Sequence, residues 1–413
     1  MTLLNRSAAA IVQAALTDTP VVVINGPRQA GKTTLTQRIE YPGSHDFVSL
    51  DDEPILEAAR QDIRNFVSRP VDTFVIDEAQ LEPRLFRAIK AAVDRDRRPG
   101  RFVLTGSSRL LSAPDMAASL VGRVETIDLW PFSQGELDGV RDTFVDVLFE
   151  SPVELVRNGA TSRQQIVDRI VTGGYPEIIN RSQQRRTHWF KSYLTTITQS
   201  VIRDISAVEH LAEIPKLLQL CATRTGNELN VSAVANDLGL PGRTVDGYLA
   251  VLAQAFLIER IPAWSTNLSK KVIRRPKLVM TDTGLAAHLI RASSSTTDRI
   301  GGPFGQLLET FVANEIRKQL TWSTETPSLW HFRDRDGAEV DLVLEHPDGR
   351  VVGIEVKATS TPSSTDLRGL RYLADRLGDR FHFGVLLHTA PEATRFGPNI
   401  AALPVSALWT PVT

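Results

Sequence analysis

The pattern of hydrophobic and polar residues divides the chain into stretches with different secondary-structure signals. Up to about residue 135, short β-branched runs such as VVVING (21–26) and TFVIDEAQ (73–80) alternate with helical patterns such as LFRAIKAAVDR (85–95). This alternation indicates a parallel sheet flanked by helices, because parallel strands need crossover helices and are buried on both faces. Residues of about 140–225 contain few strand signals and several amphipathic stretches, so a helical region is predicted there.

The pattern changes again from residue 228. VSAVANDLGL (231–240) is followed by a turn with glycine and proline, and then by RTVDGYLAVLAQAFLIERI (243–261). A short strand pair is expected around 269–282. Helix, turn, helix and hairpin in this order predict a winged helix. The segment 291–305 is rich in Ser, Thr and Gly, which makes it the predicted linker.

The stretch EVDLVLEHPDGRVVGIEVK (339–357) predicts two strands joined by a Pro-Asp-Gly turn. A hairpin centred near 347–348 would set Asp341 roughly opposite Glu355. Lys357 is two residues from Glu355 and therefore shares its face.

Two carboxylates and a lysine that converge at a strand pair can hold a divalent metal and polarise a water molecule. Asp341 and Glu355 are thus candidate ligands of a second metal, with Lys357 nearby, and Glu309 on the preceding predicted helix is the candidate additional acid. Three alternatives stay open. Asp341 and Lys357 could form a buried ion pair, the domain could bind without cleaving, or the charges could protect a sheet edge.

A phosphate-binding loop follows the first predicted strand. Gly26 to Thr33 fits the spacing G-x-x-x-x-G-K-[ST], lies after a strand and opens a helix. Backbone N–H groups, the helix N-terminus and Lys32 would attract phosphates, and Thr33 would hold Mg²⁺. Arg28 and Gln29 receive no side-chain chemistry. The residues predicted to bind the nucleotide are Gly26, Pro27, Arg28, Gln29, Ala30, Gly31, Lys32, Thr33 and Thr34.

Two acids end the strand of TFVIDEAQ, where parallel sheets bind ligands. Asp77 is expected to position the Mg²⁺ together with Thr33, and Glu78 to activate the attacking water. The next strand, in RFVLTGSS, ends in Thr105, Ser107 and Ser108, any of which could sense the γ-phosphate. Ser107 is the preferred candidate.

These motifs resemble those of a known family. The segments GPRQAGKTT, FVIDEAQ, LTGSSRLL and SLVGRVETIDLWPFSQGE are similar to AAA-type ATPases of bacteria and archaea that join an N-terminal ATPase domain to a C-terminal region of unknown function. The resemblance continues through KLVMTDTGLAAHLI, ETFVANEI, HFRDRDGAEVDLVLE and GIEVKAT, so it covers nearly the whole chain. It implies ATP and Mg²⁺ as cofactors. The Asp…Glu-x-Lys arrangement also resembles the core of restriction-endonuclease-like nucleases.

In such a family, Arg123 in the Gly-Arg step would complete the nucleotide site of a neighbouring subunit. An intramolecular salt bridge is the open alternative. The resemblance therefore implies a homo-oligomer, for which a ring is one arrangement.

Basic residues are concentrated around the predicted wing, where no acidic residue lies between Ala263 and Met280. This concentration suggests phosphate contacts with DNA, and a helix that begins near Arg243 would be the recognition helix. Docking of a protein partner by the winged helix is the open alternative. The residues predicted to bind DNA are Arg243, Lys270, Lys271, Arg274, Arg275 and Lys277.

Length, charge and cysteine content exclude a few classes of protein. A chain of 413 residues is too long for one core, and a net charge of -1 means that any nucleic-acid footprint is local. The single cysteine, Cys221, excludes an internal disulfide and a thiolate-rich metal site. No stretch approaches the length of a membrane-spanning helix and the start lacks a signal-peptide pattern, so no membrane partner and a cytoplasmic location are expected.

The predicted fold class is α/β, with four parts along the chain. These are an AAA-type P-loop NTPase domain with a parallel sheet (1–138), a helical bridge (139–225), a winged-helix domain (226–292) and a restriction-endonuclease-like α/β domain (303–413). The expected function is ATP binding and hydrolysis by a DNA-associated oligomer. The alternative is a nucleotide-gated switch that docks a protein partner and does not act on DNA.

Overall fold

The computed structural model describes residues 4–110, 120–204, 213–265, 275–299, 301–334 and 337–411. The chain folds into two compact units. The first unit comprises Met1–Phe132 and Gln254–Phe256, and the second comprises Ser133–Ala253 and Leu257–Thr413.

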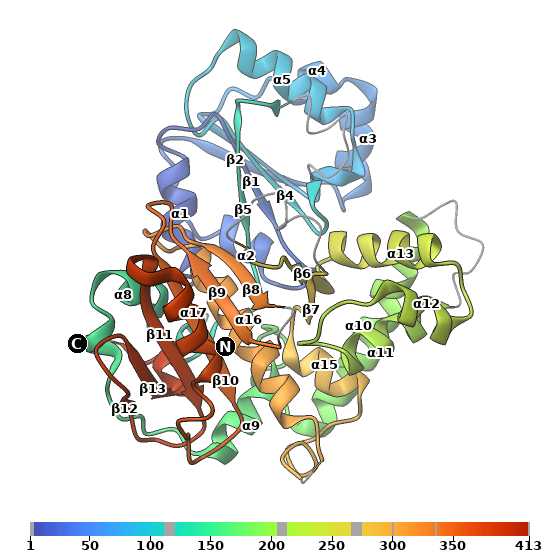
Figure 1. Cartoon of the computed structure of the whole chain (residues 1–413). Coiled ribbons are helices and arrows are strands. Elements are labelled where there is room, and N and C mark those ends of the chain that lie inside the picture. Colours follow the sequence, from blue (N-terminus) through green and yellow to red (C-terminus); the bar gives the residue numbers. More distant parts are fainter. Residues whose placement is uncertain are drawn as a thin grey trace. The chain divides into compact units, whose positions relative to one another are not determined.

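The first unit is built on a parallel sheet of five strands. They are β1 (Val21–Asn25), β2 (His45–Ser49), β3 (Thr73–Asp77), β4 (Phe102–Gly106) and β5 (Val124–Asp128). Their order across the sheet is β2-β3-β4-β1-β5. Figure 1 labels β1, β2, β4 and β5 of this sheet. The carboxyl end of β1 therefore lies beside that of β4, with β3 next in line. The parallel pairing confirms the sheet that the alternating sequence pattern predicts.

The side chains of β1 alternate between two hydrophobic cores. Val21 and Val23 pack on one face of the sheet, and Val22 and Ile24 pack on the other. Burial on both faces explains why the strand is a continuous apolar run. The helices in the described part of this unit are α1 (Ala8–Ala15), α2 (Lys32–Thr36), α3 (Glu53–Gln61), α4 (Ile63–Phe66) and α5 (Leu85–Arg95).

The second unit begins with helices, which confirms the predicted helical middle of the chain. No helix in the described ranges is both long and apolar enough to cross a lipid bilayer. The helices up to the predicted linker are α7 (Gln134–Asp138), α8 (Phe144–Glu150), α9 (Arg163–Thr172), α10 (Gln183–Asp204), α11 (Ile214–Thr223), α12 (Val231–Leu238), α13 (Gly242–Gln254) and α15 (Thr283–Leu289).

A two-stranded antiparallel pair follows α13. Its strands are β6 (Ile258–Ile261) and β7 (Lys277–Met280), and Ile261 pairs with Lys277. Of the residues that join them, 266–274 lie outside the described part of the chain. Helix α12, helix α13 and the β6–β7 pair follow one another in the predicted order, and the assignment to a winged helix stays a prediction, as do the predicted domain boundaries.

The C-terminal part of the second unit is a mixed sheet in the order β12-β13-β11-β10-β9-β8. Strand β9 (Glu339–Glu345) pairs antiparallel with β10 (Val351–Lys357), which confirms the predicted hairpin, and β10 pairs parallel with β11 (Phe381–His388). Helix α17 packs on the core of this sheet through Leu370, Leu373 and Leu377. The remaining elements are α16 (Phe304–Leu320), α17 (Arg368–Leu377), β8 (Ser328–Arg333), β12 (Thr394–Arg395) and β13 (Ile400–Pro404).

Gly284 allows α15 to approach the end of α9 closely. A Cβ atom at this position would lie 2.3 Å from the carbonyl oxygen of Thr172. We therefore expect Gly284→Ala to lower the free energy of unfolding by about 1–3 kcal/mol, because backbone must move to admit the methyl group. Gly247 in α13 is the matched control: it has open space around it, so Gly247→Ala should raise stability by up to about 1 kcal/mol. Urea unfolding followed by circular dichroism measures both, and equal effects of the two substitutions would contradict the close approach.

Candidate functional site

The loop between β1 and α2 wraps around the side chain of Lys32. Gly31 has φ of +93°, in the left-handed region that favours glycine, and it is the N-cap of α2. Lys32 is buried, and its Nζ donates to the carbonyl oxygens of Gly26 (2.9 Å) and Pro27 (3.0 Å). Burial lowers the pKa of Lys32 to about 8, although the charges of Glu78 and Asp77 act in the opposite direction. The ammonium thus lies inside the loop that would surround a phosphate.

Asp77, at the carboxyl end of β3, contacts Thr33 at the start of α2. The Thr33 hydroxyl donates to Oδ2 of Asp77 at 2.9 Å, and the Thr105 hydroxyl at the end of β4 also donates to this carboxylate. Hydroxyl and carboxylate oxygens are ligands that Mg²⁺ accepts. Thr33 and Asp77 therefore fit a magnesium ion bound together with nucleotide phosphates.

Glu78 is held in a fixed orientation beside Asp77. Its backbone has φ of +55°, which is rare for a residue with a side chain and costs of order 1–3 kcal/mol. Its N–H donates to the Thr105 hydroxyl (3.2 Å), and its Oε2 accepts from the Ser107 hydroxyl (2.9 Å) and from Nε2 of Gln80. Strained backbone that is maintained by several hydrogen bonds is typical of functional sites.

Sequence reasoning missed the contribution of Gln80. It lies on the 3₁₀ turn Ala79–Leu81 and also donates to Ser107 at 3.1 Å. Gln80 follows Glu78 by two residues, and this spacing alone gave no signal that its amide would reach the carboxylate. Ser107 is close to the predicted catalytic residue Glu78, and its role in sensing the γ-phosphate stays a prediction.

Arg123 precedes β5 at the amino-terminal edge of the sheet. Its guanidinium pairs with Asp94 of α5 (Nη2 to Oδ1, 2.6 Å) and donates to the carbonyl oxygen of Val121. The intramolecular alternative is therefore present in the structure. The role of Arg123 towards a neighbouring subunit stays a prediction.

The β9–β10 hairpin brings Asp341 and Glu355 together. Ile354 pairs with Leu342 in the antiparallel register. Glu355 follows Ile354 and Asp341 precedes Leu342, so the two acids lie next to this pair. Asp341 Oδ2 accepts from the Val356 N–H at 2.8 Å, and Lys357 Nζ lies 2.6 Å from Glu355 Oε1. Burial and the charge of Asp341 raise the pKa of Glu355 to about 8.

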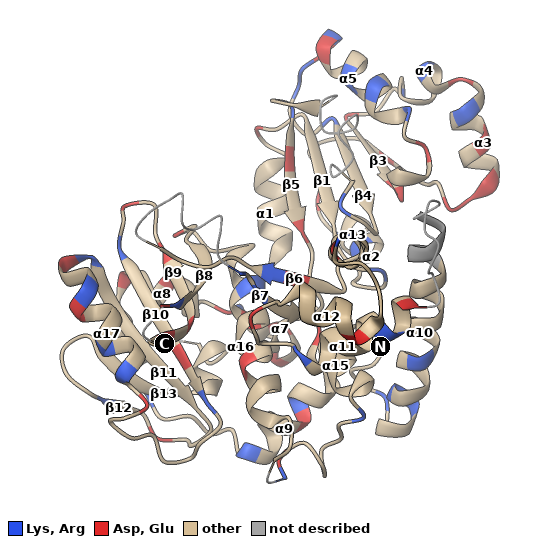
Figure 2. Cartoon of the chain, turned by 45° about the vertical axis from the view of Figure 1, so that its right-hand side comes forward, with Lys and Arg blue, Asp and Glu red and all other residues tan. Residues whose placement is uncertain are grey.

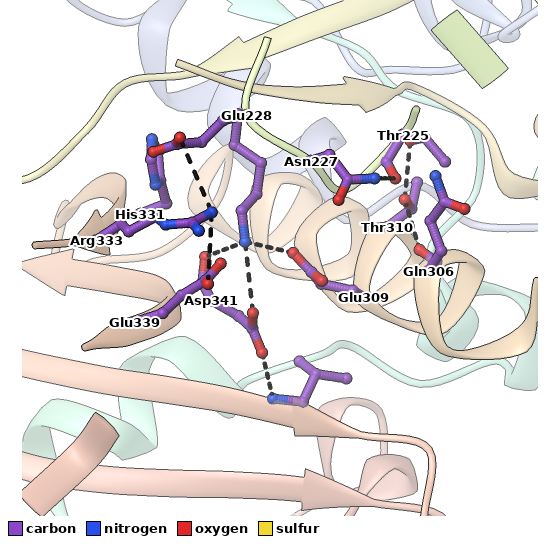
Figure 3. Close-up of polar contacts among 12 residues, drawn as sticks. Thr225, Asn227, Glu228, Gln306, Glu309, Thr310, His331, Arg333, Glu339 and Asp341 are labelled. Carbon is purple, nitrogen blue, oxygen red and sulfur yellow. Dashed lines mark hydrogen bonds and ion pairs between the residues drawn. The ribbon is translucent and has the colours of Figure 1, made fainter. Parts of the chain in front are cut away.

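Lys277 corrects one expectation. It was predicted to contact DNA, but it is only 1% exposed, on β7. Its Nζ pairs with Glu309 of α16 and contacts Asp341 at the main-chain oxygen (3.2 Å) and at Oδ1 (3.5 Å). Figure 3 labels the two acids, Glu309 and Asp341. Burial by itself would lower the pKa of Lys277, but Glu309 and Asp341 outweigh it, so the pKa lies above its usual value and the ammonium stays charged. Glu309, Asp341 and Lys277 form, with Glu355 and Lys357, the acidic centre of the second unit.

No group of three or more His, Cys, Asp or Glu side chains in the described ranges is arranged to hold a metal ion. The acidic centre contains a lysine where the sequence suggested a second metal. The predicted metal site at Asp341 and Glu355 therefore stays a prediction that this arrangement does not favour.

Two of the residues predicted to bind DNA can be located on the surface. Arg243, at the start of α13, and Arg275, just before β7, are exposed. Lys270, Lys271 and Arg274 lie outside the described residues. Figure 2 shows basic residues along α10, of which Arg185 and Lys191 are exposed.

Models of three protein domains match this chain. An AAA domain matches residues 18–138, a domain of unknown function (DUF8612) matches 163–296, and another domain of unknown function (DUF4143) matches 304–408. Two curated relatives, "Uncharacterized protein Rv2008c" of Mycobacterium tuberculosis and "Uncharacterized protein Mb2031c" of Mycobacterium bovis, are each 30% identical over 364 residues. Each alignment covers 87% of this chain and 75% of the relative.

The chain belongs to the AAA-type P-loop ATPase family with C-terminal domains of unknown function. Among solved structures, this AAA-type protein is similar to the Walker-type ATPase PABY2304 of Pyrococcus abyssi, with 14% identity and a TM-score of 0.44. That match covers 70% of this chain and 96% of the other. A likeness of this size supports no conclusion about function.

Lys32→Ala should remove nucleotide binding from the AAA-type domain. Loss of a buried charged partner costs about 2–5 kcal/mol, so we expect the dissociation constant for ATP to rise by about 30-fold or more. Equilibrium binding of a fluorescent ATP analogue measures the change. Lys90→Ala, at an exposed lysine of α5, is the control and should bind normally. Unchanged affinity in Lys32→Ala would refute the phosphate-loop assignment.

Glu78→Gln should separate binding from turnover. The amide keeps the size of the side chain but cannot take a proton from water, so we expect ATP to bind and hydrolysis to fall by about 10²–10⁴-fold. Phosphate release measures turnover, and Glu57→Gln, at an exposed position of α3, should leave it unchanged. Normal hydrolysis by the Glu78 variant would assign the base to another residue.

Proposed function

We propose that the protein binds and hydrolyses Mg·ATP and works as a DNA-associated homo-oligomer. The proposal rests on one observation above all: the Thr33 hydroxyl and the Asp77 carboxylate are 2.9 Å apart beside the buried Lys32, with Glu78 next in the chain. Thr33 and Asp77 would hold the magnesium ion, Lys32 would neutralise the phosphates, and Glu78 would orient and deprotonate the attacking water. Mg²⁺ would supply the charge that stabilises the transferred phosphoryl group.

Oligomerisation is supported by the position of Arg123. The phosphate loop follows the carboxyl end of β1, whereas Arg123 precedes the parallel strand β5 at the opposite edge. Strands of five residues that rise about 3.3 Å per residue separate these edges by on the order of 15 Å. Arg123 is therefore far from its own nucleotide site, and any contact with a γ-phosphate would be with that of a neighbouring subunit. A ring would repeat this contact at every interface.

Association with DNA is supported by exposed basic residues. Arg243 and Arg275 belong to the proposed winged helix, and Arg185 and Lys191 lie on α10. Exposed Lys and Arg side chains bind phosphates and release counterions. We propose that α12, α13 and the β6–β7 pair form the winged helix, and that the mixed sheet forms the restriction-endonuclease-like domain.

A second function is favoured by the burial of Lys277. Because Lys277 is buried, it cannot be one of the cations that contact DNA. In addition, Asp246 on α13 pairs with Arg260. Fewer free cations weaken the argument for a nucleic-acid surface. The alternative function is a nucleotide-gated switch in which the winged helix docks a protein partner.

ATP turnover in the presence of DNA distinguishes the two functions. If DNA is the track or target, single-stranded, duplex or branched DNA should raise the rate of phosphate release severalfold, and added salt should suppress the effect. The variant Arg243→Glu/Arg275→Glu should lose stimulation but keep its basal rate. Arg368→Glu, at an exposed arginine of α17, is the control and should respond like the unaltered protein.

An active ATPase that no DNA stimulates or binds would contradict DNA association and favour the switch. A protein without ATPase activity under any condition would refute ATP hydrolysis, which both functions require. Lys32→Ala serves as the blank in both cases.

A further inference from the structure

The main chain at Lys277 is fixed on both sides. Strand β7 pairs with β6, where Lys277 lies opposite Ile261. On the other side, the Leu278 N–H donates to Asn227 (2.8 Å) and the Leu229 N–H donates to Pro276 (2.8 Å). Both edges of β7 are therefore paired at Lys277. This pairing fixes the backbone from which the Lys277 side chain reaches the acidic centre.

The ammonium group of Lys277 has the surroundings of a bound cation. Three oxygens surround it, from the Glu309 carboxylate, the Asp341 carboxylate and the Asp341 main chain (Figure 3). Carboxylate and carbonyl oxygens are the ligands that Mg²⁺ and Mn²⁺ prefer. In this arrangement the lysine supplies the positive charge that such an ion would bring.

Glu355 provides an independent sign that the centre is suited to a cation. The side chain is 6% exposed, and its Oε1 pairs with Lys357. Its Oε2 is buried and has no hydrogen-bond partner among the residues that the structure describes. A buried carboxyl oxygen without a partner is costly. This oxygen would become a ligand of a divalent ion that entered beside Asp341.

We propose that Lys277 is a built-in cation that closes the acidic centre to divalent metal ions, and that the centre binds Mg²⁺ or Mn²⁺ once this charge is removed. The inference goes beyond nucleotide hydrolysis and does not depend on it. It assigns the C-terminal domain an acidic centre whose carboxylates are paired with a lysine of the neighbouring β6–β7 pair.

Binding of Mn²⁺ to the full-length protein tests the inference. Measurements are made without nucleotide and in an Asp77→Asn background, so that the phosphate site does not contribute. Added to this background, Lys277→Met/Glu309→Gln removes the ammonium at similar side-chain length and removes one carboxylate charge with it. We expect electron paramagnetic resonance to detect Mn²⁺ bound to this variant, and Mn²⁺ to raise its melting temperature. A further Glu355→Gln or Asp341→Asn change should abolish both effects.

Lys318 and Glu315 supply the matched control. They form another buried lysine–glutamate pair on α16, with Nζ and Oε1 2.6 Å apart. Lys318→Met/Glu315→Gln in the same background should gain no Mn²⁺ site, because a metal site needs the Asp341 and Glu355 ligands in addition to a vacated lysine.

Two outcomes would overturn the proposal. One is a folded Lys277→Met/Glu309→Gln protein that binds no Mn²⁺ in a Glu355-dependent way. The other needs no change at Lys277: the protein with the intact centre binds Mn²⁺, and Glu355→Gln abolishes this binding. The second measurement decides the matter even if the double variant fails to fold.

Discussion

The parallel pairing of β1 with β4, and of β4 with β3, is the constraint on which the nucleotide site depends. Parallel strands end at the same edge of a sheet, so residues from distant parts of the sequence meet there. Thr33 follows β1 by a short loop, Asp77 ends β3, and Thr105 lies near the end of β4. Their contacts leave Lys32 buried inside its loop and Glu78 strained beside Asp77. The apolar runs of the strands stabilise this geometry through burial on both faces, and the polar residues at their ends provide the chemistry.

The second unit contains a different solution to the problem of buried charge. Breaking a buried ion pair by removal of one partner costs about 3–5 kcal/mol, so buried acids need partners. Asp77 has hydroxyl partners and is a proposed ligand of magnesium. Asp341 has an internal ammonium and a backbone N–H instead. Both acids are on strands that are otherwise apolar, and they differ in what neutralises them.

This difference affects how the C-terminal domain is understood. Asp341, Glu355 and Lys357 have the order from which the sequence predicts a nuclease-like centre, and the hairpin brings Asp341 and Glu355 together. The charge of Lys277 comes from a strand that precedes the domain in sequence. The domain boundary drawn along the chain therefore passes between the acids and the cation that neutralises them. A function for the C-terminal sheet must include β7.

The sequence by itself determined the elements whose signals are local. The spacing from Gly26 to Thr33, the apolar strand before Asp77 and the Pro-Asp-Gly hairpin each specify geometry over a few residues, because strand alternation and turn chemistry act at short range. The fixing of Glu78 by Gln80 and Ser107 required the β3 and β4 strand ends to meet. The burial of Lys277 depended on the packing of β7 against α16 and β9. A basic residue in a basic stretch has the sequence signal of a surface position, and only tertiary contacts over 32 and 64 positions of the chain decided that this one is a core counter-ion.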